Sequence, residues 1–492
     1  MTVIPTTVPP IPYARRIADL VATRGDNVVL TFVPIEGDEL TSTWHELDAR
    51  SSQIARELMA RGLALGDRVA IGLRNSPLLV EAALAAWKVG AIPVPLRWDL
   101  PDWEKQRVLA VIDGRVVLDD SSIGWLNETT GLDSSPLPEA VSPLTHGICS
   151  SGSTGTPKVV LIDRPGTWDE TIGAPFPSAW QSIPVPQTVL VSAPLYHTNG
   201  FMTLYNLIAG DHIVLLEKFD AARIPGLVER HRISTLTMTS TMLQRIADLP
   251  GVDDRDWSSV QWVLQGAAVI APSLVHRMIS LVGAERFFMS YGMTEGLGTA
   301  CLRADEWLAH PGSVGRGYRE TEIRVLDEDG NDLPPGEIGE IYLRSPSSGL
   351  YHYVGGNAEK LRTLPDGFAT AGDLGTLDED GYLSIVDRRV DMVISGGANV
   401  YPAEVESALI EHPEIADVVV IGLADPEWGR RVHAIVEPAD PSSPPTATEV
   451  IAFAKSKLAA YKVPKTVELI DKVPRSEATK VNRGALVAER GG

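Results

Sequence analysis

Hydrophobic and polar positions near the N-terminus alternate between helical and strand-like spacing. Thr43 and Glu46 have the spacing of a capping box, and apolar residues follow them at about helical intervals. The run 67–73 has the composition of a strand, a helix is expected over 77–90, and 91–96 indicates another strand. A strand, a helix and a strand in this order predict a βαβ unit with parallel strands and a helix-covered sheet.

The same alternation returns further along the chain. Strand-like runs at 189–191, 213–216 and 233–236 are separated by helical stretches, which predicts a second α/β layer. From Glu322 onward, short alternating runs lie between Asp-Gly turns. These runs predict antiparallel hairpins of a small barrel.

A third pattern begins after Arg388. A helix at 402–411, strands near 418–421 and 432–436, and a helix that ends near Tyr461 indicate a small α+β domain.

The length also indicates more than one domain, because 492 residues exceed what a single core usually holds. We predict a mixed α/β fold with an N-terminal domain of residues 1–388 and a C-terminal domain of residues 389–492. The composition, 44% hydrophobic and 22% charged, is that of a globular protein, and no apolar run is long enough to span a bilayer. No secretion signal is evident before Tyr13, and two cysteines are too few for a disulfide framework, so we expect a cytoplasmic protein. Cys149 is predicted to be a small buried thiol and not a nucleophile.

The formal net charge is −21, which argues against nucleic acid as a partner. Anionic ligands must then be attracted by local groups. Lys158, Arg388 and Lys480 are candidates for that role.

The segment from Ser151 to Lys158 has the composition of an anion-binding loop. Two glycines allow unusual backbone conformations, and hydroxyls and one lysine sit among exposed N–H groups. An apolar approach and the β-branched run 159–162 predict that the loop joins two strands of a hairpin. A mononucleotide P-loop instead leads from its lysine into a helix, so that interpretation fails. A polar surface turn is the alternative.

Polar residues also gather at a predicted strand end after the apolar run 287–289. The aromatic face of Tyr291 can stack on a flat base, while Thr294 and Glu295 can hold a phosphate oxygen and a magnesium ion. A capped strand-to-loop corner is the alternative.

Two further segments carry chemistry-bearing residues. Asp373 can accept both hydroxyls of a ribose and Arg388 ends the following hairpin, although the two could instead form an ordinary turn salt bridge. Gly396 and Gly397 form a second glycine pair, and Lys480 stands near the C-terminus.

Taken together, these segments resemble the adenylate-forming superfamily, which includes acyl- and aryl-CoA synthetases, peptide-synthetase adenylation domains and luciferases. The resemblance runs from the helix that begins at Thr43 to Lys480, and several motifs in the same order make it specific. It implies a large N-terminal domain of two helix-covered sheets and a distorted β-barrel, followed by a small mobile C-terminal domain. It also implies activation of a small carboxylic acid by ATP and Mg²⁺ to an acyl-adenylate, and transfer to the thiol of coenzyme A with release of AMP and pyrophosphate.

The resemblance assigns roles residue by residue. The catalytic positions are Lys480, Thr294, Glu295 and His197, with Lys480 bridging the substrate carboxylate and the α-phosphate. The loop that grips pyrophosphate consists of Ser151, Gly152, Ser153, Thr154, Gly155, Thr156 and Lys158. The adenine-binding positions are Gly266, Ala267, Ala268, Tyr291 and Gly292. The ribose is bound by Asp373 and Arg388, and the CoA tunnel is lined by Ser395, Gly396 and Gly397. The metal positions are Glu295 and Thr154, and the acyl pocket is lined by Tyr196, Thr239, Ser240, Met289 and Gly298.

Three departures from the family pattern bear on efficiency. Val390 stands at the hinge where Asp or Lys is common, Thr479 precedes the catalytic lysine where Gly is usual, and Ala371 replaces a Thr. An enzyme that performs mainly one half-reaction therefore stays open. Two other functions also stay open: the loading of a carrier-protein phosphopantetheine thiol, and nucleotide binding without catalysis. A homodimer is open as well. Little in the pocket can pair a second charge, so we expect a largely apolar aliphatic, alicyclic or aryl acid.

Overall fold

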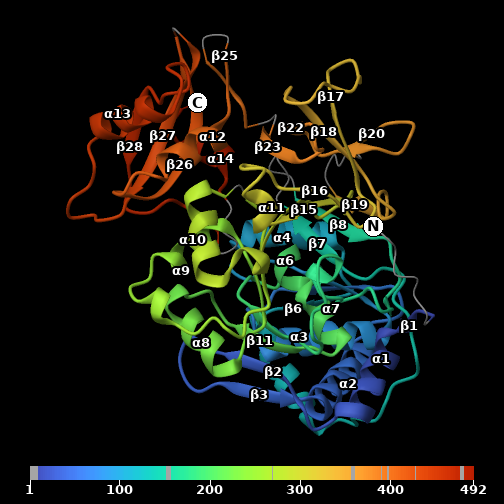
Figure 1. Cartoon of the computed structure of the whole chain (residues 1–492). Coiled ribbons are helices and arrows are strands. Elements are labelled where there is room, and N and C mark those ends of the chain that lie inside the picture. The colour runs from blue at the N-terminus through green and yellow to red at the C-terminus, as the bar shows by residue number, and fades with distance from the viewer. Residues whose placement is uncertain are drawn as a thin grey trace.

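The computed structural model describes residues 9–150, 157–268, 270–355, 361–388, 391–395, 398–426, 428–476 and 481–491, and for residues 150, 387 and 388 it describes the backbone. Figure 1 shows a large N-terminal part, coloured blue to orange, and a smaller orange-red C-terminal part beside it. Among the described residues, we find no helix with the length and apolar character needed to cross a membrane.

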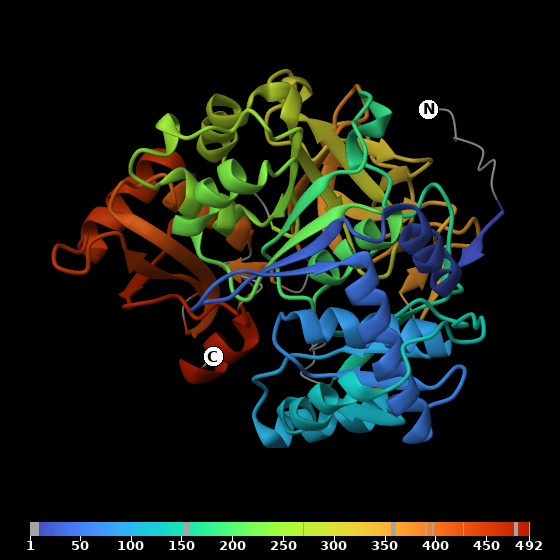
Figure 2. The same ribbon diagram turned by 90° about the horizontal axis from the view of Figure 1, so that it is seen from below.

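The largest sheet is mostly parallel. Over the described residues it has nine strands, in the spatial order β16 (Arg316–Tyr318), β15 (Thr299–Arg303), β14 (Phe287–Gly292), β13 (Trp262–Gln265), β12 (Thr235–Met238), β10 (Thr188–Val191), β11 (His212–Leu216), β2 (Val28–Val33) and β3 (Leu40–Thr43). The strands from β14 to β2 are parallel, and at the edges the pairs β2–β3, β14–β15 and β15–β16 are antiparallel. Figure 2 shows β2 and β3, in blue, beside the green strands of this sheet.

Both faces of this sheet are covered, because alternate residues of its strands enter two different cores. Val189 and Val191 of β10 pack into a core shared with α1 (Tyr13–Arg24), α2 (Trp44–Ala60), α3 (Pro77–Val89) and α7 (Thr203–Ala209). Leu190 faces the opposite core, which contains α8 (Ile224–His231), α9 (Ser240–Ala247) and α10 (Pro272–Val282). The predicted second α/β layer is confirmed.

The predicted βαβ unit is also present. Thr43 and Glu46 form the capping box of α2, while Ser76 caps α3 and the left-handed Gly90 ends it. Strands β4 (Arg68–Ile71) and β5 (Ile92–Pro95) are parallel, and β6 (Val116–Leu118) pairs with β4 on its other side. Helix α4 (Asp102–Ile112) packs into the smaller core beside them.

The antiparallel region predicted as a distorted barrel consists, over the described strands, of two sheets. One contains β17 (Glu322–Leu326), β18 (Gly339–Arg344), β20 (Arg362–Thr363), β21 (Ala369–Thr370), β22 (Asp373–Leu377) and β23 (Leu383–Arg388). The other contains β7 (Gly147–Ser150), β8 (Lys158–Ile162) and β19 (Tyr351–Val354).

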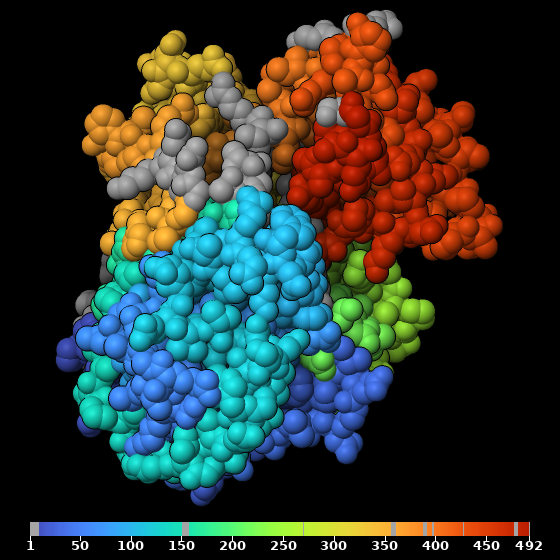
Figure 3. All heavy atoms as spheres, turned by 180° about the vertical axis from the view of Figure 1, so that it is seen from behind, coloured from blue at the N-terminus to red at the C-terminus, as the bar shows by residue number. Residues whose placement is uncertain are grey.

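The C-terminal part has its own sheet and its own core. Its strands are β24 (Val393–Ser395), β25 (Ala398–Val400), β26 (Ile415–Asp425), β27 (Gly429–Pro438) and β28 (Thr466–Leu469). Helices α12 (Pro402–Leu409), α13 (Ala447–Lys457) and α14 (Arg483–Glu489) pack against them. From behind, this part forms a separate orange-red lobe (Figure 3). Sheet membership therefore changes between β23 and β24, close to the predicted boundary after residue 388.

Some element ends differ from the predictions. The strand expected at 233–236 is β12, Thr235–Met238, and the two C-terminal helices end at Leu409 and Lys457, before Glu411 and Tyr461. Helix α12 ends in a tight turn in which the N–H of His412 donates to the carbonyl of Leu409 at 3.0 Å, and Pro413 directly after it keeps the helix from continuing.

An aromatic cluster anchors the base of the β7–β8 hairpin. It consists of Tyr13, Trp87, His146, Phe201 and Tyr205. The centroids of contacting rings in this cluster are at most 6.3 Å apart. The Tyr205 hydroxyl lies 2.8 Å from Nδ1 of His146, and Trp87 Nε1 donates to the carbonyl of Thr145 at 2.6 Å. The residues just before β7 are therefore tied to helices α1, α3 and α7.

This cluster predicts a pH dependence of stability. Burial lowers the pKa of His146 to about 3, whereas an unfolded histidine titrates near 6.5. The unfolded chain thus binds the extra proton first, so the stability that neutral His146 contributes is lost as the pH falls below about 6.5. When the pH is lowered from 7.5 to 5.5, the free energy of unfolding of the wild type, measured by urea denaturation, should fall by about 1.4 kcal/mol relative to that of His146→Gln. A difference between the two proteins that does not change with pH contradicts this prediction.

Candidate active site

The predicted hairpin around the glycine-rich loop is present. Strands β7 and β8 are antiparallel, and Ser150 pairs with Lys158 across the two strand ends that flank the loop. Lys158 begins a strand and not a helix, which confirms that this is no mononucleotide P-loop. The loop residues themselves lie outside the described residues: Ser151, Gly152, Ser153, Thr154, Gly155 and Thr156.

Lys158, Glu295 and Tyr353 form a compact cluster beside this hairpin. The Tyr353 hydroxyl donates to Oε1 of Glu295 at 2.6 Å, and Lys158 Nζ lies 3.7 Å from the same oxygen. Lys158 Nζ also lies 3.9 Å above the Tyr353 ring centroid. Burial, together with the Glu295 carboxylate, raises the pKa of Tyr353, so the phenol stays protonated and donates. The structure thus brings two predicted site residues together through a third that the sequence did not single out.

Thr294 connects the end of β14 to the histidine segment. Its hydroxyl shares a hydrogen bond of 2.9 Å with the hydroxyl of Thr198, the first residue of α6 (Thr198–Phe201). His197 precedes this helix, and its ring lies 4.7 Å from the ring of Tyr196. The structure therefore places His197 one residue from a direct contact with Thr294.

Tyr291 and Asp373 come together from two different sheets. Tyr291 lies in β14, next to Gly292 at the strand end, and its hydroxyl donates to Oδ2 of Asp373 at 2.6 Å. Asp373 is buried and begins β22, and it pairs in register with Arg388 at the end of β23. The side chain of Arg388 lies outside the description. The predicted adenine and ribose residues are therefore neighbours at the carboxyl end of β14.

The turn Gly266-Ala267-Ala268 follows β13 and is held by its neighbour Gln265. Gln265 is buried, and its Nε2 donates to the carbonyl of Ala268 at 2.6 Å and to the hydroxyl of Ser240 at 3.0 Å. Ala267 adopts a left-handed backbone with φ of 68°. Sequence reasoning missed Gln265, although a polar residue that ends an apolar strand directly before a glycine turn is a usable signal.

The predicted pocket residues occupy different environments. Thr239 caps α9 by accepting from the N–H of Met242, and Tyr196 is buried with 4% of its surface exposed. Gly298 has φ of 152°, and a Cβ there would lie 2.6 Å from the Thr321 side chain. Met289 has no exposed surface and packs in the core with α9 and α10, which is the environment of a core residue. A wall formed by these residues stays a prediction.

The C-terminal part supplies one described site residue. Ser395 is buried and ends β24, where it pairs with Ala398 and with Gly429. Gly396, Gly397 and Lys480 lie outside the described residues, as do Val390 and Thr479.

The described residues fit a magnesium ion that arrives with a nucleotide. They contain no group of three or more His, Cys, Asp or Glu side chains arranged to hold a metal. Glu295 offers one carboxylate, with 14% of its side chain exposed, beside the phosphate-loop hairpin. Mg²⁺ is commonly bound by one or two carboxylates together with substrate phosphates and water, so a single carboxylate at this place suffices.

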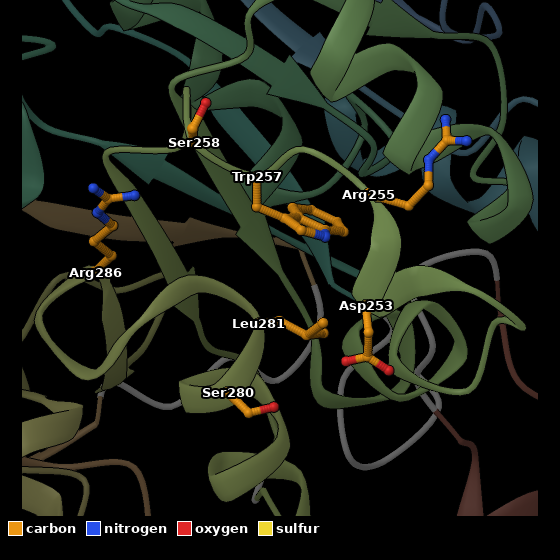
Figure 4. A pocket seen from close by; sticks show the side chains of 7 residues that line it. All are labelled: Asp253, Arg255, Trp257, Ser258, Ser280, Leu281 and Arg286. Atoms are coloured by element: carbon orange, nitrogen blue, oxygen red, sulfur yellow. The ribbon is translucent and has the colours of Figure 1, made fainter.

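Two other features are excluded from the site. Cys149 is partly exposed, not fully buried as predicted, but the burial of its thiol raises the pKa to about 12, so the thiol stays protonated at neutral pH and is not a nucleophile. A surface hollow of about 240 Å³ is lined by Asp253, Arg255, Trp257, Ser258, Ser280, Leu281 and Arg286 (Figure 4). Asp253 and Arg255 are already paired, with Arg277 and Glu229, at 2.6 Å each. None of the predicted site residues lines this hollow.

A two-domain α/β protein with these groups at the carboxyl ends of its parallel strands belongs to the nucleotide-binding class. The sequence matches the AMP-binding enzyme family over residues 17–351 and the AMP-binding enzyme C-terminal domain over residues 404–480. The chain therefore belongs to the AMP-binding enzyme family, which confirms the resemblance to the adenylate-forming superfamily.

Relatives with named activities align over nearly their whole length. A fatty acid–[acyl-carrier-protein] ligase of Streptomyces coeruleorubidus is 33% identical over 91% of this chain and 91% of its own. A feruloyl-CoA synthase of an Amycolatopsis species is 34% identical over 90% of this chain and 93% of its own. Among solved structures, the o-succinylbenzoate CoA synthetase of Bacillus subtilis with ATP and a magnesium ion is similar with a TM-score of 0.81. It is 27% identical, and the match covers 97% of this chain and 99% of that one.

Proposed function

We propose that the chain is an AMP-forming acid–thiol ligase that joins a carboxylic acid to coenzyme A. The observation that carries the proposal is the convergence of Tyr291, Thr294 and Glu295 with Asp373 and Lys158 around the carboxyl end of β14. The full-length similarity to a feruloyl-CoA synthase supports CoA as the acceptor.

The reaction proceeds in two half-reactions at one site. A carboxylate is a poor electrophile, so one of its oxygens first attacks the α-phosphate of ATP, and the bond from that phosphorus to pyrophosphate breaks. Magnesium, when bound, neutralises charge on the phosphate oxygens. Thr294 and Lys480 stabilise the charge that develops on the α-phosphate, and Glu295 would hold the metal. The thiolate of CoA then attacks the acyl carbon, and AMP leaves.

The other predicted residues bind and orient. Residues 151–158 hold the β- and γ-phosphates, the 266–268 turn with Tyr291 and Gly292 holds adenine, and Asp373 with Arg388 holds ribose. Residues 395–397 line the path of the CoA arm after the C-terminal domain, residues 389–492, rotates on the N-terminal domain, residues 1–388. His197, next to the Thr198 contact with Thr294, belongs to the acyl side of the site.

The acid substrate is proposed to be largely apolar. The predicted pocket residues Tyr196, Thr239, Ser240, Met289 and Gly298 carry no charge, and a buried carboxylate without a partner is costly. The proposed compartment is the cytoplasm, where free thiols such as those of its two cysteines stay reduced.

A carrier-protein acceptor is the second candidate, because one of the similar enzymes is an acyl-carrier-protein ligase. The two acceptors present the same phosphopantetheine arm, so only an assay separates them.

A pyrophosphate-release screen over aliphatic, alicyclic and aryl acids tests the proposal. Each acid is assayed alone, with CoA, and with a holo-carrier protein. The proposal expects pyrophosphate release with at least one acid, and thioester yield at least tenfold higher with CoA than with the carrier. A reversed ratio favours the carrier ligase, and no AMP from any acid contradicts an active ligase.

A further inference from the structure

Tyr353 connects Glu295, the proposed metal ligand, to Lys158, the lysine at the end of the proposed pyrophosphate-binding loop. It lies on β19, where it pairs with Val160 of β8. Lys158 is two residues from Val160, so the side chains of Tyr353 and Lys158 emerge on the same face as diagonal neighbours. The pairing of two strands therefore places the Tyr353 ring under the ammonium, 3.9 Å from Nζ to the ring centroid.

The orientation of this ring is fixed from a second side. Tyr351, on the same face of β19, packs edge-on against it, with ring centroids 5.3 Å apart and an interplanar angle of 68°. The hydroxyl of Tyr353 then reaches Oε1 of Glu295, 58 residues earlier in the chain, at 2.6 Å.

The separation between the two opposite charges is the unusual feature. Lys158 Nζ lies 3.7 Å from Glu295 Oε1, beyond the range of a direct hydrogen bond, although both side chains are mostly buried at 23% and 14% exposure. Opposite charges this close and this shielded attract strongly. The ring face gives the ammonium an alternative partner, and the hydroxyl occupies the oxygen that the ammonium would otherwise take.

We propose that Tyr353 is a positioning residue that keeps the ion pair of Lys158 and Glu295 from closing from 3.7 Å to hydrogen-bonding distance. Glu295 then stays available to Mg²⁺, and Lys158 stays available to the phosphates that the metal accompanies. The inference rests on the proposed function for the identity of these two ligands. It adds a residue that acts through Glu295 and Lys158 and touches neither the acid nor the thiol.

Two substitutions separate the hydroxyl from the ring. Tyr353→Phe keeps the ring under Lys158 and removes only the hydrogen bond to Glu295, whereas Tyr353→Leu removes both. The readout is ATP binding by titration calorimetry without any acid, once with EDTA and once with Mg²⁺. The ratio of the two dissociation constants, which we term the metal gain, measures how much the ion strengthens nucleotide binding.

We expect Tyr353→Phe to lower the metal gain about tenfold, the loss of one hydrogen bond to a charged group, and to leave ATP binding in EDTA within about twofold of wild type. Tyr353→Leu should lower the metal gain about fivefold further, because the ammonium then moves onto the carboxylate. In a Lys158→Met background, Phe and Leu at position 353 should give equal metal gains, because no ammonium is left to move. A purely structural role for the ring would preserve their difference there.

Tyr382→Phe serves as the matched control, since it removes one hydroxyl from a buried tyrosine that stacks on His310, away from this cluster. Its metal gain should equal that of the wild type. The proposal is overturned if the metal gain of Tyr353→Phe falls less than about fivefold, or if Phe and Leu differ equally with and without Lys158. A wild type without any metal gain instead counts against the proposed nucleotide chemistry.

Discussion

Replacing Lys480 by alanine is expected to lower ATP-dependent adenylate formation about 100- to 1000-fold, while thioester formation from a supplied acyl-adenylate stays within about threefold of wild type. In the proposed function, Lys480 supplies positive charge where the carboxylate attacks the α-phosphate, and this charge is not needed once the adenylate exists. The match to the family's C-terminal domain extends to Lys480, which supports this assignment. Pyrophosphate exchange and CoA thioester yield measure the two steps separately.

Lys472→Ala is the control for this prediction, because it removes an exposed lysine from the same C-terminal region. It should leave both half-reactions unchanged. Adenylate formation by Lys480→Ala within fivefold of wild type contradicts the assigned role, and an equal loss in both half-reactions points to a defect in folding.

The second large effect is expected at Asp373. Asp373→Ala should raise the KM for ATP about 100-fold in pyrophosphate exchange and change kcat little, because two charge-assisted hydrogen bonds to ribose are lost from binding alone. Tyr291→Phe should raise it only about five- to tenfold, since the carboxylate remains but loses the hydroxyl that fixes its orientation at 2.6 Å.

Asp332→Ala provides a matched loss of a carboxylate in the same antiparallel region, where Asp332 pairs with Arg324 on the surface. Its KM for ATP should not change. An Asp373→Ala enzyme with the wild-type KM would place ribose elsewhere.

Local signals predicted the elements of the N-terminal domain well. The structure confirms the capping box of Thr43 and Glu46, and the helix expected over 77–90 is present as Pro77–Val89, capped by Ser76 and ended by Gly90. The hairpin around the phosphate loop was predictable for the same reason, because its strands flank the loop directly.

Contacts between distant segments could not be predicted from such signals. Tyr353 reaches Glu295 because β19 pairs with β8, and Thr198 reaches Thr294 because α6 starts beside the end of β14. Alternation along a strand says which residues share a face, but it does not say which strand lies next to it. Met289 shows a related limit, since the family resemblance assigned it to the acyl pocket, whereas the packing places its side chain in a core.

The nucleotide product of the reaction tests the central claim most directly. The enzyme is incubated with α-labelled ATP, Mg²⁺, CoA and an acid identified in the screen, and all products are separated and counted. The account predicts AMP, pyrophosphate and acyl-CoA in equal amounts, because the acid attacks the α-phosphate and the β- and γ-phosphates leave together. ADP and inorganic phosphate as the products would contradict it.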